Sequence, residues 1–344
     1  MSRWAVVLAG GVGSRFWPLS TPSRPKQLLP LVNEKPLLVQ AVERLGPVVP
    51  LERVLILTNA GLVPAIREML PGIPRKNLIA EPRAGGTAAA LTWAAQEIAR
   101  RAGPDDVMIS IHADWAIRDE PAFQRALTRA AEVAEEHHAL VTVGVVPTRP
   151  DPGLGHIQPG EEIDGDARRV ERFVEKPDLA RAEQMTRDGY LWNSGIFAWR
   201  VGDYLDEVRR LTPEVAPALH AHAADIDGFF AAVKPIAVDV GVLERSDRVA
   251  VLPGDFGWDD VGTWAALRRV RTTDAAGNAT QGRVHTVDSR DNVVHAPAHS
   301  VVLYGVSDLV VVVEDGMVLV TTVERSMNLK HLIEALPRGV TERE

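Results

Sequence analysis

The sequence predicts an α/β fold: a doubly wound mixed sheet followed by a small domain built from strands alone. Up to about residue 145, short runs rich in Val and Ile alternate with helical patterns, which is the arrangement that builds a sheet covered by helices on both faces. Beyond about residue 277, short apolar runs separated by turn residues replace the helices. A length of 344 residues suits one large domain and a smaller one. We therefore expect domains over residues 1–276 and 277–344.

The elements expected in the large domain follow one another in a Rossmann-like order. Its β-branched runs predict strands over residues 5–8, 54–58, 78–80, 107–111 and 140–145. Apolar residues at helical spacing predict helices over residues 87–102 and 121–136. Proline and glycine accumulate over residues 148–165, so we expect a long surface loop there that approaches the ligand.

The small domain is expected to be β-helix-like or a sandwich. Its apolar runs lie at residues 284–287, 293–295, 301–304, 309–313 and 317–320, roughly eight to nine residues apart. This regular spacing fits a small coil of strands as well as two packed sheets. The runs contain no cluster of candidate catalytic residues.

Composition excludes several classes of protein. A net charge of -8 argues against binding to nucleic acid or to an anionic membrane surface. The absence of cysteine excludes disulfides, thiolate metal sites and cysteine nucleophiles, which makes the cytoplasm the default location. The apolar run over residues 4–9 ends at two glycines and is too short for a signal peptide, and no run approaches the ~20 residues needed to span a bilayer.

A glycine-rich turn follows the first strand and is suited to binding an anion. Its glycines bring backbone N–H groups close to a phosphate, and we expect nucleotide contacts from Gly10, Gly11, Gly13 and Ser14. The turn is not a dinucleotide fingerprint, because Phe16 stands where that pattern needs glycine, and it lacks the Gly-Lys-Ser/Thr of a P-loop.

The segment after this turn is expected to be extended and cationic. Prolines at positions 18, 22 and 25 prevent an immediate helix. Arg15, Arg24 and Lys26 lie within twelve residues, a density of positive charge that suits a triphosphate. The alternative is an ordinary tight turn with solvated basic side chains.

The order of these residues resembles a known family. Residues 8–20 read LAGGVGSRFWPLS and residues 24–27 read RPKQ, which is similar to the signature of sugar nucleotidyltransferases. The WPLS and PKQ versions resemble the mannose-1-phosphate guanylyltransferase branch. The resemblance extends over about residues 5–333 and includes five motifs in family order. Bifunctional members of the family carry a further isomerase domain, which this chain is expected to lack.

Two aspartates are expected to hold Mg²⁺, which nucleotidyl transfer usually needs. Asp114 follows the strand at 107–111 and Asp260 follows an apolar run at 249–252, and open α/β sheets bind ligands beyond such strand ends. The family's metal-binding motifs match the same two positions. Asp259 is kept in reserve, and the alternative for each aspartate is a helix N-cap.

The resemblance also implies a pocket for the sugar phosphate and a site for the base. Glu175 and Lys176 would contact the sugar and its phosphate, or form a surface ion pair. Asn193 and Gly155 would contact the sugar hydroxyls. The base-side contacts implied are Glu81, Gly86 and Thr87, in a segment that otherwise reads as a helix start. This segment departs from the family pattern at Gly85 and Gly86. The choice of guanine as the base is therefore implied by the resemblance as a whole and not by this segment.

The implied reaction joins GTP and mannose 1-phosphate into GDP-mannose and pyrophosphate. The sugar phosphate attacks the α-phosphorus in line, while Arg15, Lys26 and Lys176 neutralise the phosphates. Two alternatives stay open: the same chemistry on another nucleotide and sugar phosphate, such as glucose 1-phosphate, or a non-catalytic nucleotide-sugar sensor. A homodimer is also left open.

Overall fold

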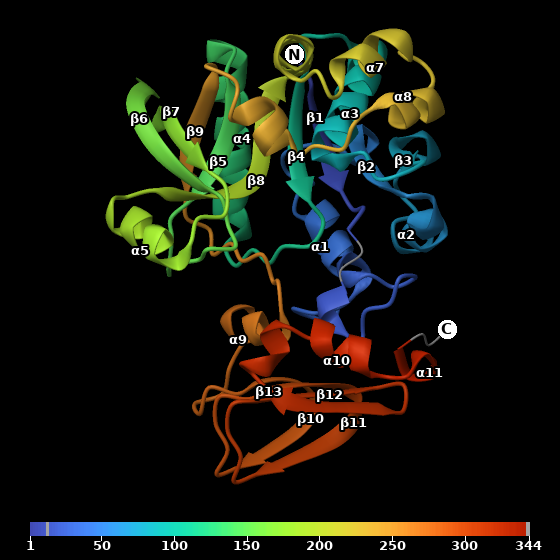
Figure 1. The fold of residues 1–344 in the computed structure, drawn as a ribbon, viewed down its shortest axis with the longest axis vertical. Coiled ribbons are helices and arrows are strands. Elements are labelled where there is room, and N and C mark those ends of the chain that lie inside the picture. Colours follow the sequence, from blue (N-terminus) through green and yellow to red (C-terminus); the bar gives the residue numbers. More distant parts are fainter. Residues whose placement is uncertain (12–13, 342–344) are drawn as a thin grey trace. The chain divides into compact units, whose positions relative to one another are not determined.

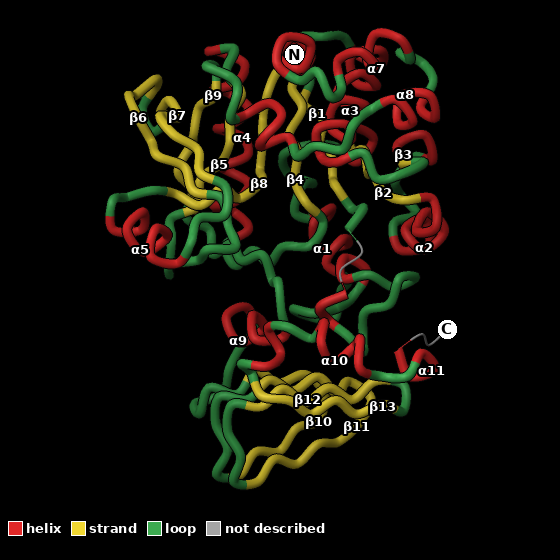
Figure 2. The backbone as a smooth tube through the Cα atoms, viewed as in Figure 1, coloured by secondary structure: helices red, strands yellow, loops and turns green. Residues whose placement is uncertain are grey.

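A computed structural model describes residues 1–11 and 14–341, which form two compact units (Figure 1). Unit 1 consists of Met1–Gly10, Ala41–Ala113 and Asp119–Trp258. Unit 2 consists of Gly11–Gln40, Asp114–Arg118 and Asp259–Glu344. Each unit contains its own β-sheet, as Figure 2 shows. The domain boundary expected at residues 276 and 277 stays a prediction.

The sheet of unit 1 has nine strands and is mixed, as the sequence predicts. The strand order is β3-β2-β1-β4-β8-β5-β9-β7-β6. The first four strands in this order are parallel, whereas β8 is antiparallel to both β4 and β5. The bounds are β1 Arg3–Leu8, β2 Val54–Asn59, β3 Leu78–Glu81, β4 Val107–His112, β5 Leu140–Val145, β6 His156–Asp164, β7 Ala167–Val174, β8 Leu191–Arg200 and β9 Val249–Gly254.

Both faces of this sheet are covered, which is why its central strands are continuous apolar runs. Along β1, Val6 and Leu8 belong to a core cluster with helix α3, whereas Ala5 and Val7 point the opposite way and are also fully buried. The helices of unit 1 are α2 Val63–Met69, α3 Gly86–Ala102, α4 Glu120–His137, α5 Leu179–Arg187, α6 Val201–Leu211, α7 Ala216–Ala221 and α8 Ile226–Ala232. A further helix, α1 Leu37–Glu43, passes from unit 2 into unit 1. None of the described helices is long and apolar enough to cross a membrane.

The expected loop at 148–165 is wrong in its second half, where the chain forms β6. The strand lies at the end of the sheet order; it pairs with β7 and, only at His156 and Ile157, also with β8. Its register shifts at Pro159, next to Gly160. Proline and glycine are tolerated at such an edge because a missing N–H or a bulge costs little there. The proline and glycine that predicted a loop therefore lie in an edge strand.

Unit 2 contains a four-stranded sheet that is largely parallel and so resembles a coil of strands rather than a sandwich. Its strands are β10 Ala279–Val287, β11 Val293–Tyr304, β12 Leu309–Glu314 and β13 Met317–Thr322. β10, β11 and β12 pair in parallel, and β13 closes the sheet antiparallel to β12. The separate strands expected at 293–295 and 301–304 are one strand, β11, because the chain stays extended through an irregularity opposite Gly282.

Stacked asparagines hold successive turns of this coil at their corners. The Oδ1 of Asn278 accepts from the backbone N–H of Asn292 at 3.0 Å, and the Oδ1 of Asn292 accepts from the N–H of Leu309 at 3.0 Å. Both asparagines are fully buried. Such repeated side-chain caps satisfy backbone groups that a parallel coil leaves unpaired at each corner.

The segment 14–40 packs into unit 2 as part of its core. Phe16 and Leu29 belong to the same cluster as Trp264 and the sheet residues Val310 and Val312. The Trp264 indole donates to the carbonyl of Trp17 at 3.1 Å. Before α1 begins at Leu37, this segment contains only short 3₁₀ turns, at Ser14–Phe16 and Lys26–Leu28, in agreement with the extended segment expected there.

Candidate active site

Lys26, Asp114 and Asp260 come together in unit 2 from three distant parts of the sequence. The Lys26 ammonium donates to Asp114 Oδ2 at 2.9 Å and to the backbone carbonyl oxygen of Asp260 at 2.6 Å. Lys26 is only 7% exposed, so its charge is compensated by these two neighbours rather than by bulk water. Both predicted metal ligands therefore belong to one cluster organised by a buried lysine.

Backbone pairing brings the two aspartates into register. The N–H of Ala116 donates to the carbonyl of Asp259 at 2.9 Å, and the N–H of Asp259 donates back to Ala116 at 3.0 Å. This two-way bridge places residues 114–118 alongside residues 259–260. The alternative role of each aspartate was a helix N-cap. Two separate N-caps would not require this pairing between their segments.

Asp259 supports the turn that carries Asp260. Arg269 donates two hydrogen bonds to the buried Asp259 carboxylate, from Nε to Oδ2 at 2.6 Å and from Nη2 to Oδ1 at 3.0 Å. The same carboxylate accepts from the N–H of Val261, whose φ of 46° lies in the left-handed region that β-branched residues avoid. Because Asp259 is engaged in this way, Asp260 remains the better metal candidate.

Arg15 lies beside Asp260. A Cβ atom built on Gly262 would lie 2.7 Å from Asp260 Oδ2 and 3.4 Å from Arg15 Nη1. A side chain at position 262 would therefore collide with the carboxylate, and glycine lets the guanidinium and the carboxylate approach the same point. Arg15 is exposed and so can reach a ligand.

Part of the glycine-rich turn lies outside the described residues, namely Val12, Gly13 and the side chain of Ser14. Gln27, which is buried, donates from Nε2 to the carbonyl of Gly11 at 2.9 Å and so ties the turn to the segment after it. A Cβ added at Gly11 would meet no atom of the described residues within 4 Å. Among these residues, steric contact does not require glycine at position 11.

The three residues predicted to contact the sugar lie together in unit 1. A Cβ on Gly155 would lie 2.8 Å from Glu175 Oε2 and 3.3 Å from the Cβ of Asn193. The backbone also joins them, because the N–H of Asn193 donates to the carbonyl of Gly155 at 2.8 Å. Glycine at position 155 thus allows a carboxylate and a carboxamide to face one small space.

Lys176 turns back toward Glu175. Its φ of 44° reverses the chain after β7, and its ammonium donates to Glu175 Oε1 at 2.7 Å. The side chains of Lys176 and Glu175 are 64% and 32% exposed, so this pair contributes little to stability. The ion pair considered as the alternative is present, and it also keeps a cation next to the sugar-side carboxylate.

Asp239 belongs to the same cluster, and sequence reasoning missed it. Asn193 Nδ2 donates to Asp239 Oδ1 at 2.7 Å, and Asn193 Oδ1 accepts from Thr142 Oγ1 at 3.2 Å. Burial raises the pKa of Asp239, and the nearby Glu175 carboxylate raises it further. Asp239 lies in a short π-helical turn, Asp239–Leu243, which matches no motif, so the sequence contained no signal for it.

Gly86 and Thr87 hold the chain segment that leads to Asp239. Gly86 has a φ of 80°, and a Cβ on it would lie 2.3 Å from the carbonyl oxygen of Ile236. Thr87 Oγ1 accepts from the N–H of Val238 at 2.9 Å. The helix start considered as the alternative is present, with Gly85 as the N-cap of α3 and no side-chain cap. Both residues therefore have a structural role beside any contact with a nucleotide.

Glu81, at the end of β3, faces the glycine-rich turn. Its Oε1 lies 3.4 Å from the position of a Cβ on Gly10. Burial raises the pKa of the Glu81 carboxyl to about 7. A carboxyl that changes charge near neutral pH and lies beside a glycine-rich turn is typical of a functional site.

Comparison with known proteins identifies the family to which these residues belong. The sequence matches the family model for nucleotidyl transferases over residues 4–277. The chain belongs to the nucleotidyl transferase family. A mannose-1-phosphate guanylyltransferase of Klebsiella pneumoniae is 35% identical over 350 residues, which cover 97% of this chain and 74% of that protein. The xanthan biosynthesis protein XanB of Xanthomonas campestris pv. campestris is 36% identical over 343 residues, covering 96% and 72%.

A solved structure agrees with this nucleotidyl transferase over nearly its whole length. It is the crystal structure of a protein from Thermus thermophilus called mannose-1-phosphate geranyltransferase, with a TM-score of 0.91 and 36% identity. The match covers 97% of this chain and 99% of that one. The predicted family resemblance and the predicted fold class are both confirmed.

Nucleotidyl transferases are typically metal-dependent, and the donor set in unit 2 fits a hard divalent cation. Asp114 and Asp260 supply carboxylate oxygens, the ligands that such cations prefer. The Lys26 ammonium bonds to Asp114 Oδ2 and to the backbone carbonyl of Asp260, which keeps the two aspartates in one cluster. The residues present are therefore suited to hold a metal ion together with phosphate oxygens.

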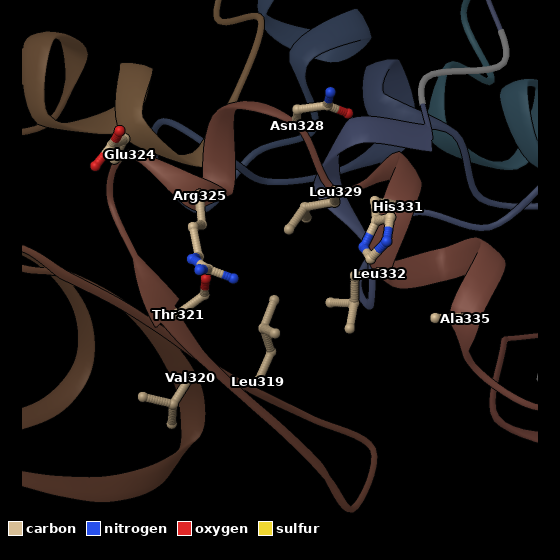
Figure 3. A pocket seen from close by; sticks show the side chains of 10 residues that line it. All are labelled: Leu319, Val320, Thr321, Glu324, Arg325, Asn328, Leu329, His331, Leu332 and Ala335. Atoms are coloured by element: carbon tan, nitrogen blue, oxygen red, sulfur yellow. The ribbon is translucent and has the colours of Figure 1, made fainter.

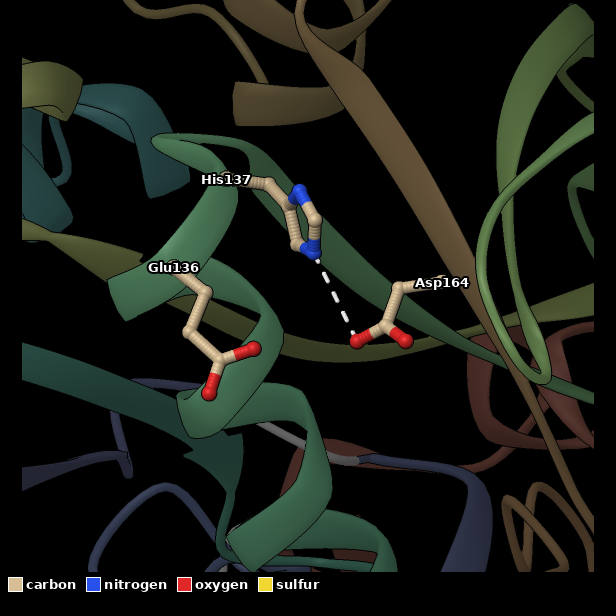
Figure 4. Close-up of side chains that lie close together, drawn as sticks. All are labelled: Glu136, His137 and Asp164. Atoms are coloured by element: carbon tan, nitrogen blue, oxygen red, sulfur yellow. Dashed lines mark ion pairs between the residues drawn. The ribbon is translucent and has the colours of Figure 1, made fainter.

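A second group of candidate metal ligands in this nucleotidyl transferase is better explained by ion pairing. Glu136, His137 and Asp164 lie close together near the end of α4, and an ion pair of 3.5 Å joins His137 Nε2 to Asp164 Oδ2 (Figure 4). Arg129 donates to the same oxygen at 2.8 Å and lowers the pKa of Asp164. The ion pairs with Arg129 and His137 account for this exposed group without a metal, and we assign none to it.

Proposed function

We propose that this nucleotidyl transferase transfers GMP from GTP to α-D-mannose 1-phosphate, giving GDP-mannose and pyrophosphate. The observation that carries the proposal is the cluster in which Lys26 bonds both to Asp114 and to Asp260. A buried lysine that bonds to the carboxylate of Asp114 and to the backbone of Asp260, beside an exposed arginine, suits a metal-bound triphosphate. The relatives called mannose-1-phosphate guanylyltransferase support this choice of substrates.

The chemistry requires no nucleophile from the protein. A phosphate oxygen of mannose 1-phosphate forms a bond to the α-phosphorus of GTP, and the bond from that phosphorus to the oxygen bridging to the β-phosphorus breaks. The electron pair leaves with pyrophosphate. Because both reactants are anions, the main barrier is their mutual repulsion and their orientation, which cations and fixed positions reduce.

Each cation of the site has a separate task in this proposal. Arg15 neutralises the departing pyrophosphate, and Lys176 neutralises the attacking sugar phosphate. Lys26 positions Asp114 and Asp260 and adds its charge next to the triphosphate. Asp114 and Asp260 would hold Mg²⁺, which would neutralise phosphate oxygens.

On the sugar side, Glu175 and Asn193 bind hydroxyl groups, and Gly155 leaves the space for them. The Asn193 carboxamide is oriented by Thr142 and Asp239, which fixes which of its atoms faces the ligand. A carboxylate that accepts and an oriented amide can together distinguish the directions of neighbouring hydroxyls. These contacts support a sugar substrate, such as mannose, that the protein distinguishes by the orientation of its hydroxyl groups.

On the nucleotide side, Gly10, Gly11, Gly13 and Ser14 contact the phosphates, Gly86 and Thr87 line the base, and Glu81 selects guanine. Guanine presents N–H donors at N1 and N2, which an ionised carboxylate accepts together. Adenine presents an acceptor at N1 and would be repelled. An acidic group near this position therefore favours GTP over ATP.

The test is pyrophosphate release from each common nucleoside triphosphate, combined with mannose or glucose 1-phosphate, with and without Mg²⁺. Release that requires GTP, mannose 1-phosphate and the metal is the expected result. Release with another pair keeps the mechanism and overturns the specificity. Binding of GDP-mannose with no release from any pair overturns catalysis and leaves a nucleotide-sugar sensor. A cytoplasmic location and a homodimer stay predictions.

A further inference from the structure

A pocket in unit 2 joins Arg15 to the last part of the chain. Its volume is about 500 Å³, which lies within the range of small-molecule sites. Besides Arg15, its lining comes from one continuous segment with the helix α10, Lys330–Ala335. The lining residues are Arg15, Met327, Asn328, Leu329, Lys330, Ile333 and Glu334.

Two cations face this pocket, and one carboxylate balances them only weakly. The Lys330 ammonium lies 3.8 Å from Glu334 Oε1, beyond hydrogen-bond distance, and the two side chains are 81% and 64% exposed. Such an exposed pair has a small interaction energy and gives way to a more highly charged partner. Lys330 can therefore turn its ammonium toward a ligand.

The same pocket is connected to the candidate metal site through Arg15. The guanidinium of Arg15 and the carboxylate of Asp260 both approach the position of a Cβ on Gly262, so Arg15 belongs to the pocket and also lies beside a candidate metal ligand. Lys26 is occupied by Asp114 and the Asp260 carbonyl. A triphosphate whose α-phosphate lies at these carboxylates would need further positive charge for its two outer phosphates.

We propose that Lys330 acts with Arg15 to bind the β- and γ-phosphates of GTP, and afterwards the pyrophosphate that they become. The inference rests on the proposed function and assigns a new ligand-binding residue to it. Two cations that line one pocket offset the charge that concentrates on pyrophosphate as the bond to the α-phosphorus breaks. A lysine suits this position because its flexible point charge can follow the phosphate as it leaves.

The adjacent residue offers a matched control. His331 lines a different pocket of about 540 Å³, which shares Asn328 and Leu329 with the first pocket but not Arg15 or Lys330. Figure 3 shows its ring beside Leu332, with Leu319 and Leu329 also lining that space. His331→Ala therefore changes the same short helix without removing charge from the Arg15 pocket.

The experiment measures steady-state kinetics in both directions for the wild type, Lys330→Ala, Lys330→Arg and His331→Ala. For Lys330→Ala we expect KM for pyrophosphate and for GTP to rise about tenfold, the factor typical of losing one charged hydrogen bond. KM for mannose 1-phosphate should stay unchanged. Lys330→Arg should restore most of the affinity, and His331→Ala should match the wild type.

Direct binding separates this inference from the proposed function. Calorimetric titration with pyrophosphate and Mg²⁺ needs no turnover, and it should show weaker binding for Lys330→Ala than for the wild type. If the wild type makes no GDP-mannose but Lys330→Ala still weakens pyrophosphate binding, the proposed function fails and the phosphate site stands. If the wild type is active and Lys330→Ala leaves both the kinetic constants and pyrophosphate binding unchanged, the inference is overturned.

Discussion

The Lys26 ammonium donates to the Asp114 carboxylate at 2.9 Å, and Lys26 is almost completely buried. Because the same ammonium also bonds to the carbonyl of Asp260, one side chain sets the spacing of both predicted metal ligands. Disturbing a buried cation with two such partners is costly, since its removal takes a cationic partner away from the Asp114 carboxylate. Lys26 is therefore expected to act on the metal as well as on the triphosphate.

Replacing Lys26 by methionine, which keeps the length but not the charge, should lower kcat about 100-fold and raise the Mg²⁺ concentration needed for half-maximal rate. Pyrophosphate release measured against Mg²⁺ concentration tests this. Lys26→Met combined with Asp114→Asn should lose less than the sum of the two single effects, because both remove the same contact. Additive effects, or a Lys76→Met control that behaves like Lys26→Met, would contradict the assignment.

Arg15 should be needed for turnover and dispensable for folding. It is exposed and lies beside Asp260, so Arg15→Ala leaves no cavity in the core. We expect kcat to fall about 100-fold or more, since a cation that stabilises developing negative charge has an effect of that size. Thermal unfolding should show an unchanged Tm. Near-normal turnover in a folded Arg15→Ala protein would remove Arg15 from the reaction.

Glu81 should make the affinity for GTP depend on pH near neutrality. Its pKa is raised to about 7, so the carboxyl is increasingly ionised as pH rises from 6 to 8. Only the ionised form accepts both N–H groups of guanine, and KM for GTP should therefore fall across this range.

The same burial costs stability as pH rises from 4.5, the ordinary pKa of a glutamate, to 7, because the folded state holds its proton longer.

Glu81→Gln provides the control for this pH dependence. Glutamine has a similar shape and does not titrate, so the inflection in KM for GTP should disappear and discrimination against ATP should weaken. Asp225→Asn, far from the turn in sequence and in a helix N-cap, should keep the inflection. An inflection that persists in Glu81→Gln would assign the titration to another group.

The sequence predicted the strands well where burial alone shapes them. β5 has the predicted bounds, and β1 to β4 differ by one or two residues, because each is a buried apolar run. β6 was missed because Pro159 and Gly160 are tolerated only by its edge position, which is a tertiary property. The merging of two runs into β11 likewise depends on its neighbour Gly282, not on its own residues.

The candidate site could be predicted where the position of a residue along the sequence indicates its role. Asp114 and Asp260 each follow a strand, and the structure brings both to Lys26. Asp239 and Lys330 could not be predicted in this way. Asp239 is a candidate because Asn193 donates a hydrogen bond to it. Lys330 is a candidate because it lines the same pocket as Arg15. Neither relationship leaves a local pattern, so only folding reveals them.

Asp239 should affect the sugar phosphate and not the nucleotide. Asp239→Ala removes the acceptor of Asn193 Nδ2 and frees the carboxamide to rotate. We expect KM for mannose 1-phosphate to rise about tenfold while KM for GTP stays unchanged. Asp239→Asn keeps a side-chain oxygen for the same contact and should recover part of the loss. Equal effects on both substrates would indicate a general change in unit 1.

His295 should make unit 2 sensitive to acid. It is buried beside Arg271, whose Nη2 lies 3.1 Å from His295 Nδ1, and burial, with the nearby positive charges, lowers its pKa to about 3. In the unfolded chain the imidazole binds a proton near pH 6.5. Between pH 6.5 and 3 the unfolded state therefore holds more protons than the folded state, and stability falls as pH falls through this window.

From pH 7 to pH 5 this single group should remove about 2 kcal/mol from the free energy of unfolding. Urea unfolding followed by tryptophan fluorescence is suitable, because the Trp264 ring lies 5.6 Å from the His295 ring. His295→Gln keeps an acceptor for Arg271 and does not titrate, so it should lose about 2 kcal/mol less than the wild type over the same interval. The exposed His299, changed to glutamine, should keep the wild-type dependence. Equal losses in His295→Gln and the wild type would show that other groups cause the acid sensitivity.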